Sequence, residues 1–161
     1  MDESVTIRVA RSDDADIIGM LWQHLADYHR DLNTMMPVPA VDGAERYAAR
    51  VQSRLDDSYT KTLVAEVSGE VIGYVMGIIV DLLPEMFEQE RAGFLADIYV
   101  RPEHRGKGIG RGLVSSLADW FRSRGIEHME WYVASANHSG IAFWLAMGGR
   151  DVMTRMRLTL T

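Results

Sequence analysis

Apolar residues recur along the chain at two spacings, one typical of helices and one typical of strands. Where they recur every three or four residues, as from Ile17 to Tyr28, the spacing predicts an amphipathic helix. Helices are predicted over residues 13–32, 43–56, 109–125 and 139–147. Short β-prone or alternating runs predict strands over residues 6–10, 63–67, 71–80, 94–100, 126–133 and 152–160.

The order of these elements predicts a single mixed α/β domain over residues 1–161. The turn Ser68-Gly69-Glu70 joins two strands into a hairpin, so these strands should pair antiparallel. The strand, helix and strand between residues 94 and 133 form a crossover, which should bring its two strands together in parallel. A chain of 161 residues supports one hydrophobic core and is too short for two ordinary domains.

The composition of the chain mainly excludes certain kinds of site and partner. With 47% hydrophobic and 25% charged residues, the chain has the balance of a globular protein. It has no cysteine, which excludes disulfides, thiolate metal ligands and a cysteine nucleophile. A net charge of −6 argues against nucleic-acid binding. The start is acidic and polar, and no apolar run approaches the roughly 18 to 20 residues of a membrane span, so we expect a cytoplasmic protein without membrane contact.

One short segment departs from the acidic average. The strand that ends near Val100 runs through the glycine-rich sequence RGKGIGR, residues 105–111, directly into a helix. Glycines let the backbone turn tightly and approach a ligand, and the first N–H groups of a helix form an anion site. Residues 101–111 hold four basic residues and one acid, a local charge of +3. The pattern predicts a site for a small polyanion.

Two nucleotide-binding motifs do not fit this loop. A Walker loop would need Ser or Thr after Gly106-Lys107, where the chain has Gly108. A dinucleotide fingerprint that starts at Gly106 or Gly108 would need glycine in place of Arg111 or Leu113. An anion or nucleotide site with a coincidental loop, or an ordinary glycine-rich turn, is the remaining alternative.

These residues resemble the GNAT superfamily of N-acetyltransferases. Residues 105–110 match its Arg/Gln-x-x-Gly-x-Gly/Ala motif, and residues 98–102 look like its splayed fourth strand. Asn137, with Ala142-Phe143-Trp144 and Gly148-Gly149 after it, resembles its second conserved block. The resemblance covers essentially the whole chain. It implies the GNAT acyl-CoA N-acyltransferase fold, an α/β fold with a mixed central sheet that splays between strands 4 and 5 and with helices on both faces.

The resemblance also implies a set of residues that bind acetyl-CoA. The pyrophosphate of coenzyme A would lie on N–H groups of residues 106–111. Main-chain groups of residues 98–100 would pair with the pantetheine arm as an added strand, and an N–H of Tyr99 or Val100 would polarise the thioester carbonyl. The predicted cofactor-binding residues are Ile98, Tyr99, Val100, Arg105, Gly106, Lys107, Gly108, Ile109, Gly110, Arg111, Asn137, Phe143 and Trp144.

Transfer to an amine requires removal of a proton. An alkyl amine has a pKa of about 10.4, so at pH 7 only about one molecule in 2,500 is neutral. Asp97, on the strand beside the proposed cofactor, is the first candidate for a base or amine holder, and Glu130 on the neighbouring strand is the second. Tyr99 and Tyr132 fall on the same strand faces by alternation. The alternative for Asp97 is a structural role, in which it caps a strand or pairs with an arginine.

The sequence departs from the family pattern at Trp144. The family commonly has there a tyrosine thought to protonate the leaving thiolate, and an indole N–H supplies no usable proton. A leaving thiol with a pKa of about 8.5, like that of cysteine, departs tolerably well as a thiolate. Tyr99, Tyr132 and water are replacement acids, which we do not rank. Packing on a short helix is the other interpretation of Trp144.

Two further groups of residues concern the acceptor. His24 and His29 would point into the acceptor site from the first helix, or else serve packing or surface roles. An acidic stretch between the third and fourth strands would attract a cationic amine, unless it is a solvated loop. This stretch contains Asp81, Glu85, Glu88 and Glu90. No His, Asp or Glu cluster has metal-binding spacing.

We therefore predict an acetyl-CoA-dependent N-acetyltransferase that acts on a small-molecule or peptide primary amine by direct attack in a ternary complex. The alternative is a non-catalytic acyl-CoA-binding module of GNAT fold that acts as a sensor or interaction domain. The resemblance is compatible with a homodimer, in which the predicted strand at 152–160 would join the interface.

Overall fold

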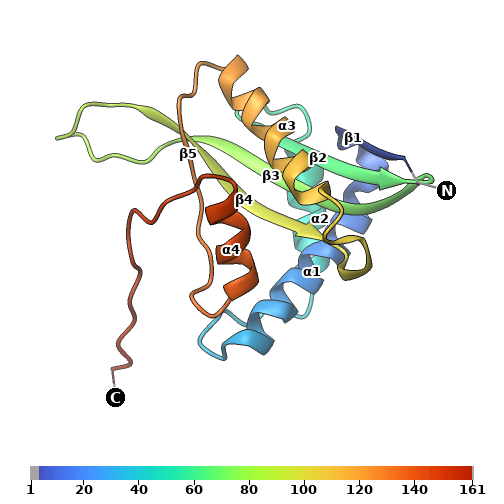
Figure 1. Ribbon diagram of the computed structural model, residues 1–161, viewed down its shortest axis with the longest axis horizontal. Helices are drawn as coiled ribbons and strands as arrows, with labels where there is room; N and C mark the ends of the chain where they lie inside the picture. The colour runs from blue at the N-terminus through green and yellow to red at the C-terminus, as the bar shows by residue number, and fades with distance from the viewer. Residues whose placement is uncertain (1–3, 161) are drawn as a thin grey trace.

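The computed structural model describes residues 4–160 and has a five-stranded sheet covered by helices (Figure 1). The strands are β1 (Val5–Val9), β2 (Thr60–Val67), β3 (Glu70–Asp81), β4 (Arg91–Val100) and β5 (Met129–Glu130). The helices are α1 (Ala15–Leu32), α2 (Gly43–Ser53), α3 (Ile109–Ser123) and α4 (His138–Ala146), with short 3-10 turns η1 (Ser12–Asp14) and η2 (Pro102–His104). The predicted mixed α/β class is confirmed.

The sheet has the order β1-β2-β3-β4-β5. The first four strands pair antiparallel, and β4 and β5 pair in parallel, as the crossover predicts. The parallel ladder contains only two residue pairs, Gly93 with Met129 and Phe94 with Glu130. Beyond these pairs the two strands separate, so the predicted splay between strands 4 and 5 is confirmed.

Two predicted strands differ from the structure. The strand expected over residues 126–133 shrinks to β5, because the chain leaves the sheet after Glu130. The strand expected over residues 152–160 is wrong: these residues are exposed and form no strand. Alternation describes which side chains share a face, but a strand also needs a neighbouring edge to pair with. Among the described residues, no strand of this chain pairs with that segment.

Helices bury both faces of the sheet in two separate cores (Figure 1). On one face α3 and α4 pack over the sheet, with Leu113, Leu117 and Trp144 in the core. On the other face α1 and α2 cover the sheet, with Leu21 and Tyr47 buried. The predicted placement of helices on both faces is therefore confirmed.

Helices α1 and α2 lie unusually close together. A Cβ atom at Gly19 would be only 2.4 Å from the carbonyl oxygen of Ala44, so this contact requires glycine. The close approach presses α2 against the sheet and brings its Tyr47 to β4. This packing positions one side of the candidate site.

Candidate functional site

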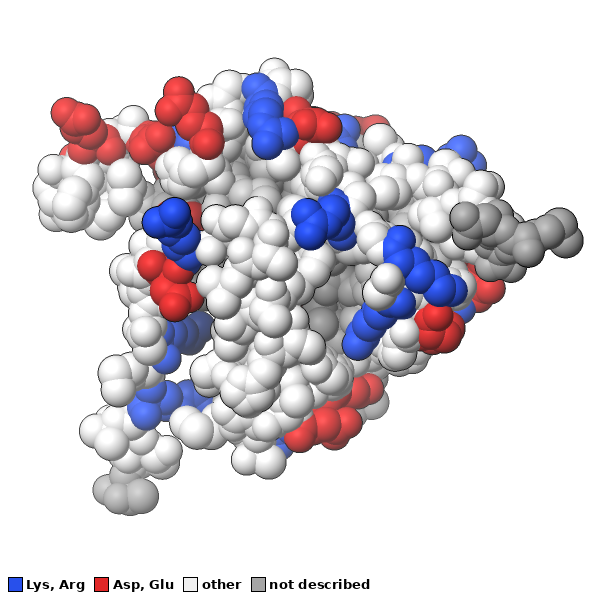
Figure 2. Space-filling view, in the orientation of Figure 1, with Lys and Arg blue, Asp and Glu red and all other residues white. Residues whose placement is uncertain are grey.

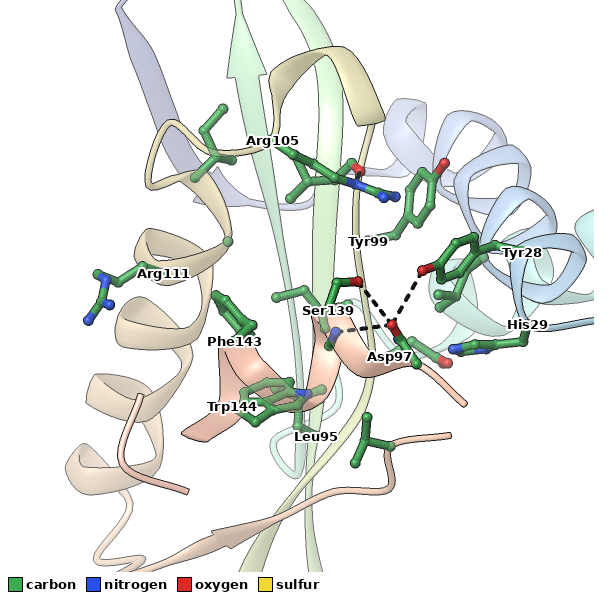
Figure 3. Close-up of a pocket in the computed structure, with 18 of the residues that line it drawn as sticks. Tyr28, His29, Leu95, Asp97, Tyr99, Arg105, Arg111, Ser139, Phe143 and Trp144 are labelled. Atoms are coloured by element: carbon green, nitrogen blue, oxygen red, sulfur yellow. Dashed lines mark hydrogen bonds between the residues drawn. The ribbon is translucent and has the colours of Figure 1, made fainter. Parts of the chain in front are cut away.

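The site is a cleft at the place where β4 and β5 separate (Figure 3). Its volume is about 520 Å³, and its walls come from α1, β4, the segment that leads into α3, residues 132–140 and α4. Because the parallel ladder ends at Phe94, the β4 edge from Leu95 to Val100 borders the cleft, and no strand within residues 4–160 pairs with it on that side. An extended ligand can pair with such an edge as an added strand.

The N-terminus of α3 closes one end of the cleft. Gly106 and Gly108 have φ values of 75° and 82°, a left-handed conformation that favours glycine. The first N–H groups of a helix have no partner within it, and together with the helix dipole they favour an anion. Opposite them, Phe143 packs on Gly110, where a Cβ would lie 3.5 Å from the ring. This end of the cleft suits a phosphate or pyrophosphate.

Arg105 links this loop to the rest of the cleft. Its guanidinium carbon lies 5.7 Å from the ring centroid of Tyr28 and 5.2 Å from that of Tyr99. Its Nε donates a hydrogen bond to the carbonyl of Val100 over 2.8 Å. Figure 3 shows the side chain directed toward the two tyrosines. Arg105 therefore holds the glycine-rich loop against β4 and α1, a role that its charge alone did not indicate.

A β-bulge in β4 directs Asp97. Met76 pairs with Asp97 and the next residue, Gly77, pairs with Leu95, so Ala96 is the extra residue of the bulge. Regular alternation would place residues 95 and 97 on the same face. With the bulge, Leu95 packs in the α3 core while Asp97 bonds to α2. The bulge therefore turns the carboxylate to the α1–α2 side of the cleft.

A tyrosine of α2 holds this carboxylate. The Tyr47 hydroxyl donates to Oδ2 of Asp97 over 2.8 Å. Burial raises the pKa of Asp97 to about 6, while the hydrogen bond from Tyr47 and the charge of Arg50 oppose the rise. Burial and the Asp97 charge raise the pKa of Tyr47 well above its ordinary value, so Tyr47 stays a neutral donor. The cleft thus contains a carboxylate that changes protonation near neutral pH, as catalytic bases do.

Aromatic contacts fix Tyr47 in place. Its ring stacks on Trp22 with the centroids 5.3 Å apart, and the edge of Tyr74 lies against it at 6.0 Å. The Tyr74 hydroxyl is buried with no hydrogen-bond partner among the described residues. Since Tyr47 and Tyr74 are both buried, the hydroxyl that bonds Asp97 has little freedom to move.

Asn137 joins α4 to α1 across the cleft. Its Oδ1 accepts hydrogen bonds from the Gly140 N–H, the Ser139 hydroxyl and the Tyr28 hydroxyl, at 3.0, 3.2 and 3.3 Å. These bonds are drawn as dashed lines in Figure 3. Asn137 is thus the N-cap of α4, and it also lines the cleft, where it was predicted to steady coenzyme A.

Trp144 lies within a cluster of aromatic rings. Its ring centroid is 4.4 Å from that of Trp131 and 4.9 Å from that of Phe143. The residue is buried, although part of it lines the cleft. Packing therefore accounts for most of its surface.

The structure brings most of the predicted site residues together. Those that line the cleft are Asp97, Ile98, Tyr99, Val100, Arg105, Gly106, Gly108, Ile109, Gly110, Arg111, Tyr132, Asn137, Phe143 and Trp144. Lys107 and Glu130 do not line it. Glu130 is exposed, with its carboxylate 3.9 Å from Nε2 of His128. Tyr132 lies at the opening, 78% exposed, with its ring against Phe94.

The acceptor predictions had mixed outcomes. His29 lines the cleft, and burial lowers its pKa, whereas His24 lies beside Tyr99 outside the lining. No residue of the acidic stretch at 81–90 lines the cleft, and the whole stretch is exposed, including Asp81 at the end of β3. Its placement matches the alternative of a surface loop.

Tyr28 and Tyr47 are two contributors to the site that sequence reasoning missed. Tyr28 was visible only as one position in the apolar face of the first predicted helix, and Tyr47 had no signal of its own. Both act through contacts with residues at least 50 positions away in the chain. A single sequence contains no marker for such pairs.

Two kinds of feature, a metal-binding cluster and a membrane-spanning helix, are not found within residues 4–160. We find no group of three or more His, Cys, Asp or Glu side chains arranged to hold a metal ion there. The same part of the chain contains no helix that is long and apolar enough to cross a membrane.

Comparison with known proteins now identifies the family. Residues 20–148 match the model of the acetyltransferase (GNAT) family. The chain is 28% identical over 152 residues to the thialysine N-epsilon-acetyltransferase of Bos taurus, covering 92% of this chain and 85% of that one. It is 44% identical over 54 residues to the streptothricin acetyltransferase of Streptomyces lavendulae, which covers 34% of this chain and 29% of that one.

Solved structures agree on the fold. A predicted acetyltransferase from Clostridium acetobutylicum, solved with acetyl-CoA, superposes with a TM-score of 0.77 at 16% identity, over 97% of this chain and 96% of that one. The family match covers most of the chain, and the cleft contains a helix N-terminus and an open strand edge, which suit an acyl-CoA. The chain therefore belongs to the GNAT acetyltransferase family, and its activity is N-acyl transfer with acyl-CoA as co-substrate.

Proposed function

We propose that the chain transfers an acetyl group from acetyl-CoA to a primary amine by direct attack within a ternary complex. The observation that carries this proposal is the meeting of three features in one cleft: the N-terminus of α3, the open edge of β4 and the carboxylate of Asp97. The first two suit an acyl-CoA, and the third suits a cationic amine.

The acyl-CoA end of the cleft is made largely of backbone. The turn at Gly106 and Gly108 exposes N–H groups for a pyrophosphate, and Arg111 lies beside them in the lining. The β4 edge from Ile98 to Val100 offers main-chain groups to the extended pantetheine arm. When bound there, acetyl-CoA supplies an activated acyl group, which the main chain of β4 would polarise.

Asp97 would hold the amine and accept its proton. An ammonium group must lose a proton before nitrogen can attack a carbonyl carbon. A carboxylate with a pKa of about 6 is ionised at neutral pH, so it can attract the ammonium and then take the proton. Tyr47 donates to one oxygen of Asp97 and keeps the carboxylate oriented.

No tyrosine stands at position 144 to protonate the leaving thiolate. We propose that the thiolate leaves without a dedicated acid, since a thiol pKa of about 8.5 makes it a tolerable leaving group. Trp144 packs among aromatic rings, which fits a structural role.

For the acceptor, we propose a primary amine at the end of a flexible aliphatic chain. One relative, which aligns with 92% of this chain, is named for the ε-amine of thialysine, a lysine analogue. In this chain Asp97 is the one carboxylate among the residues that line the cleft, and Leu25, Leu95 and Val133 supply apolar walls. A single ammonium on an apolar stem matches this arrangement.

An amine panel with acetyl-CoA tests the proposal, with detection of free coenzyme A thiol. The panel should include thialysine, lysine, polyamines, aminoglycosides and peptide N-termini. We expect turnover with at least one terminal alkyl amine. Binding of acetyl-CoA without turnover across the panel would favour the non-catalytic sensor, and absence of binding by calorimetry would overturn both.

A further inference from the structure

The cleft is closed at the point where β4 and β5 begin to separate, and Trp144 fills this closed end. The ladder between the two strands ends at the pair Phe94 and Glu130. Leu95 and Trp131 are therefore the first residues beyond the ladder on its two sides. The ring of Trp144 lies 4.4 Å from that of Trp131, centroid to centroid, and Trp144 shares a buried core with Leu95. Figure 3 shows Trp144 and Leu95 at the same end of the cleft.

The indole of Trp144 is supported from behind. A Cβ atom at Gly149 would lie only 2.8 Å from the ring of Trp131 and 3.0 Å from the carbonyl oxygen of Trp144, so Trp131 packs directly on this backbone. The Gly149 N–H donates to the same carbonyl over 2.9 Å. Trp131 is thus held between Gly149 and the ring of Trp144, outside the lining of the cleft. With this support Trp144, which is 8% exposed, forms a fixed wall.

The wall at this end is apolar. Leu95 is buried, and Val133 and Phe143 line the same cleft. Helix α4, which carries Phe143 and Trp144, contains no Asp, Glu, Lys or Arg. Figure 2 shows the surface over α4 free of charged side chains. An alkyl group gains free energy when it leaves water for such surroundings, so the closed end suits an alkyl group.

The bulge in β4 places this wall and the acceptor residues on different sides of the strand. Asp97 accepts its hydrogen bond from Tyr47 on the α1–α2 side, whereas Leu95 packs in the core under α3 and α4. An amine held at Asp97 would therefore reach the acyl carbonyl from the α1–α2 side. The alkyl part of the acyl group would then extend toward Leu95 and Trp144.

We propose that Trp144 limits the acyl group to a short chain, so that the protein accepts acetyl-CoA and rejects acyl-CoAs with longer alkyl chains. This inference rests on the proposed function, which places the acyl-CoA along β4. Added methylenes in a closely packed apolar site force neighbouring side chains into strained positions. A wall made of Trp144 and backed by Trp131 accommodates them poorly. Besides its packing role, Trp144 is therefore a specificity-determining residue.

Calorimetry without an amine tests this acyl preference apart from turnover. The wild-type chain should bind hexanoyl-CoA at least about tenfold more weakly than acetyl-CoA, because the longer chain overfills the closed end. Trp144→Ala opens a cavity there and should reduce the difference to about threefold or less. Trp120→Ala is the matched control. Trp120 packs against the same core but lies outside the lining of the cleft, so the variant should keep the wild-type preference.

Trp144→Phe is a second variant with less risk to the fold, since it keeps an aromatic ring in the cluster. It should bind butyryl-CoA as well as acetyl-CoA and should still bind hexanoyl-CoA more weakly. Circular dichroism shows whether each variant is folded. The preference is read from binding, so it is measured even if the chain turns over no amine.

The outcomes separate this inference from the proposed function. Equal binding of hexanoyl-CoA and acetyl-CoA by the wild-type chain would overturn the inference and leave acetyl transfer in place. Folded Trp144 variants with the wild-type preference would do the same. Absence of binding by every acyl-CoA would overturn the proposed function together with the inference.

Discussion

The two ends of the cleft are built in different ways. The end that suits coenzyme A comes from one continuous stretch, from Ile98 on β4 to Arg111 on α3, and it acts mainly through its backbone. The acceptor end combines side chains from three separate elements: Tyr28 of α1, Tyr47 of α2 and Asp97 of β4.

This difference determines which changes in sequence each end of the cleft can accept. Backbone recognition needs glycine at the turn and little else, so its sequence signal is compact and readable. The acceptor end depends on which side chains the helices bring to β4, and one substitution on α1 or α2 changes it without altering the glycine-rich motif. The cofactor is therefore shared across a family more readily than the acceptor.

The largest effect is expected at the acceptor end, from Asp97→Asn. General base catalysis contributes roughly 10² to 10⁴ in rate, so the rate at pH 7 should fall by that order. The deficit should shrink as pH rises, because more of the amine loses its proton unaided. Steady-state rates between pH 6 and 9 check this, with Glu130→Gln as a control that should keep wild-type activity. A loss that does not depend on pH would assign Asp97 an orienting role.

The same variant should change stability with a defined sign. The pKa of Asp97 is about 6 in the folded protein, against an ordinary value of 3.8, so the folded state disfavours the charged form. This cost is absent below about pH 4 and complete above about pH 6. Asp97→Asn should therefore raise the free energy of unfolding at pH 7 and leave it unchanged near pH 3.5. Urea titrations at both pH values measure it.

At the cofactor end, Gly108→Asp should weaken acetyl-CoA binding about tenfold or more, since it strains a left-handed turn and adds a negative charge beside the anion site. Gly125→Asp is the matched control, because Gly125 also has positive φ and open space around it but lies after the far end of α3. Calorimetry should show weaker binding for Gly108→Asp alone, while both variants lose thermal stability. Equal binding of acetyl-CoA by the two variants would show that the cofactor does not bind at this turn.

Tyr47→Phe should shift the pH profile rather than abolish activity. The Tyr47 hydrogen bond favours the charged form of Asp97, so its loss raises the pKa of Asp97 further. The acidic limb of the rate profile should move to higher pH, with a several-fold loss at pH 7. Tyr74→Phe removes a neighbouring buried hydroxyl that has no partner among the described residues, and it should leave the profile in place. A profile unchanged by Tyr47→Phe would limit Tyr47 to packing.

The smallest effect is expected from Tyr28→Phe. Tyr28 lies between the two ends of the cleft, where it contacts both Asn137 and Arg105. The substitution removes one of three hydrogen bonds to Asn137 Oδ1 and keeps the ring under Arg105. A single such bond contributes roughly 0.5 to 1.5 kcal/mol, so the KM for acetyl-CoA should rise less than about tenfold. Tyr28→Leu, which also removes the ring, should raise it more. Equal values for the two variants would show that the ring contact with Arg105 has no role.

Most of the secondary structure and the glycine-rich turn before α3 were predictable because their signals are local. Helical spacing located α1 to α4, and β-prone runs located β1 to β4, within a few residues. The failures have a common cause. The strands expected at residues 126–133 and 152–160 depend on a neighbouring edge, and that edge is set by the splay rather than by the side-chain pattern.

The sequence alone was enough to establish the α/β class and the resemblance to the GNAT family and to predict an anion site at the start of α3, since each rests on residues close together in the chain. Only the tertiary structure shows the bulge at Ala96, the Tyr47–Asp97 pair and the unpaired C-terminal segment. Each of these depends on contacts between distant residues, and it is packing rather than local spacing that sets the direction and pKa of the Asp97 carboxylate.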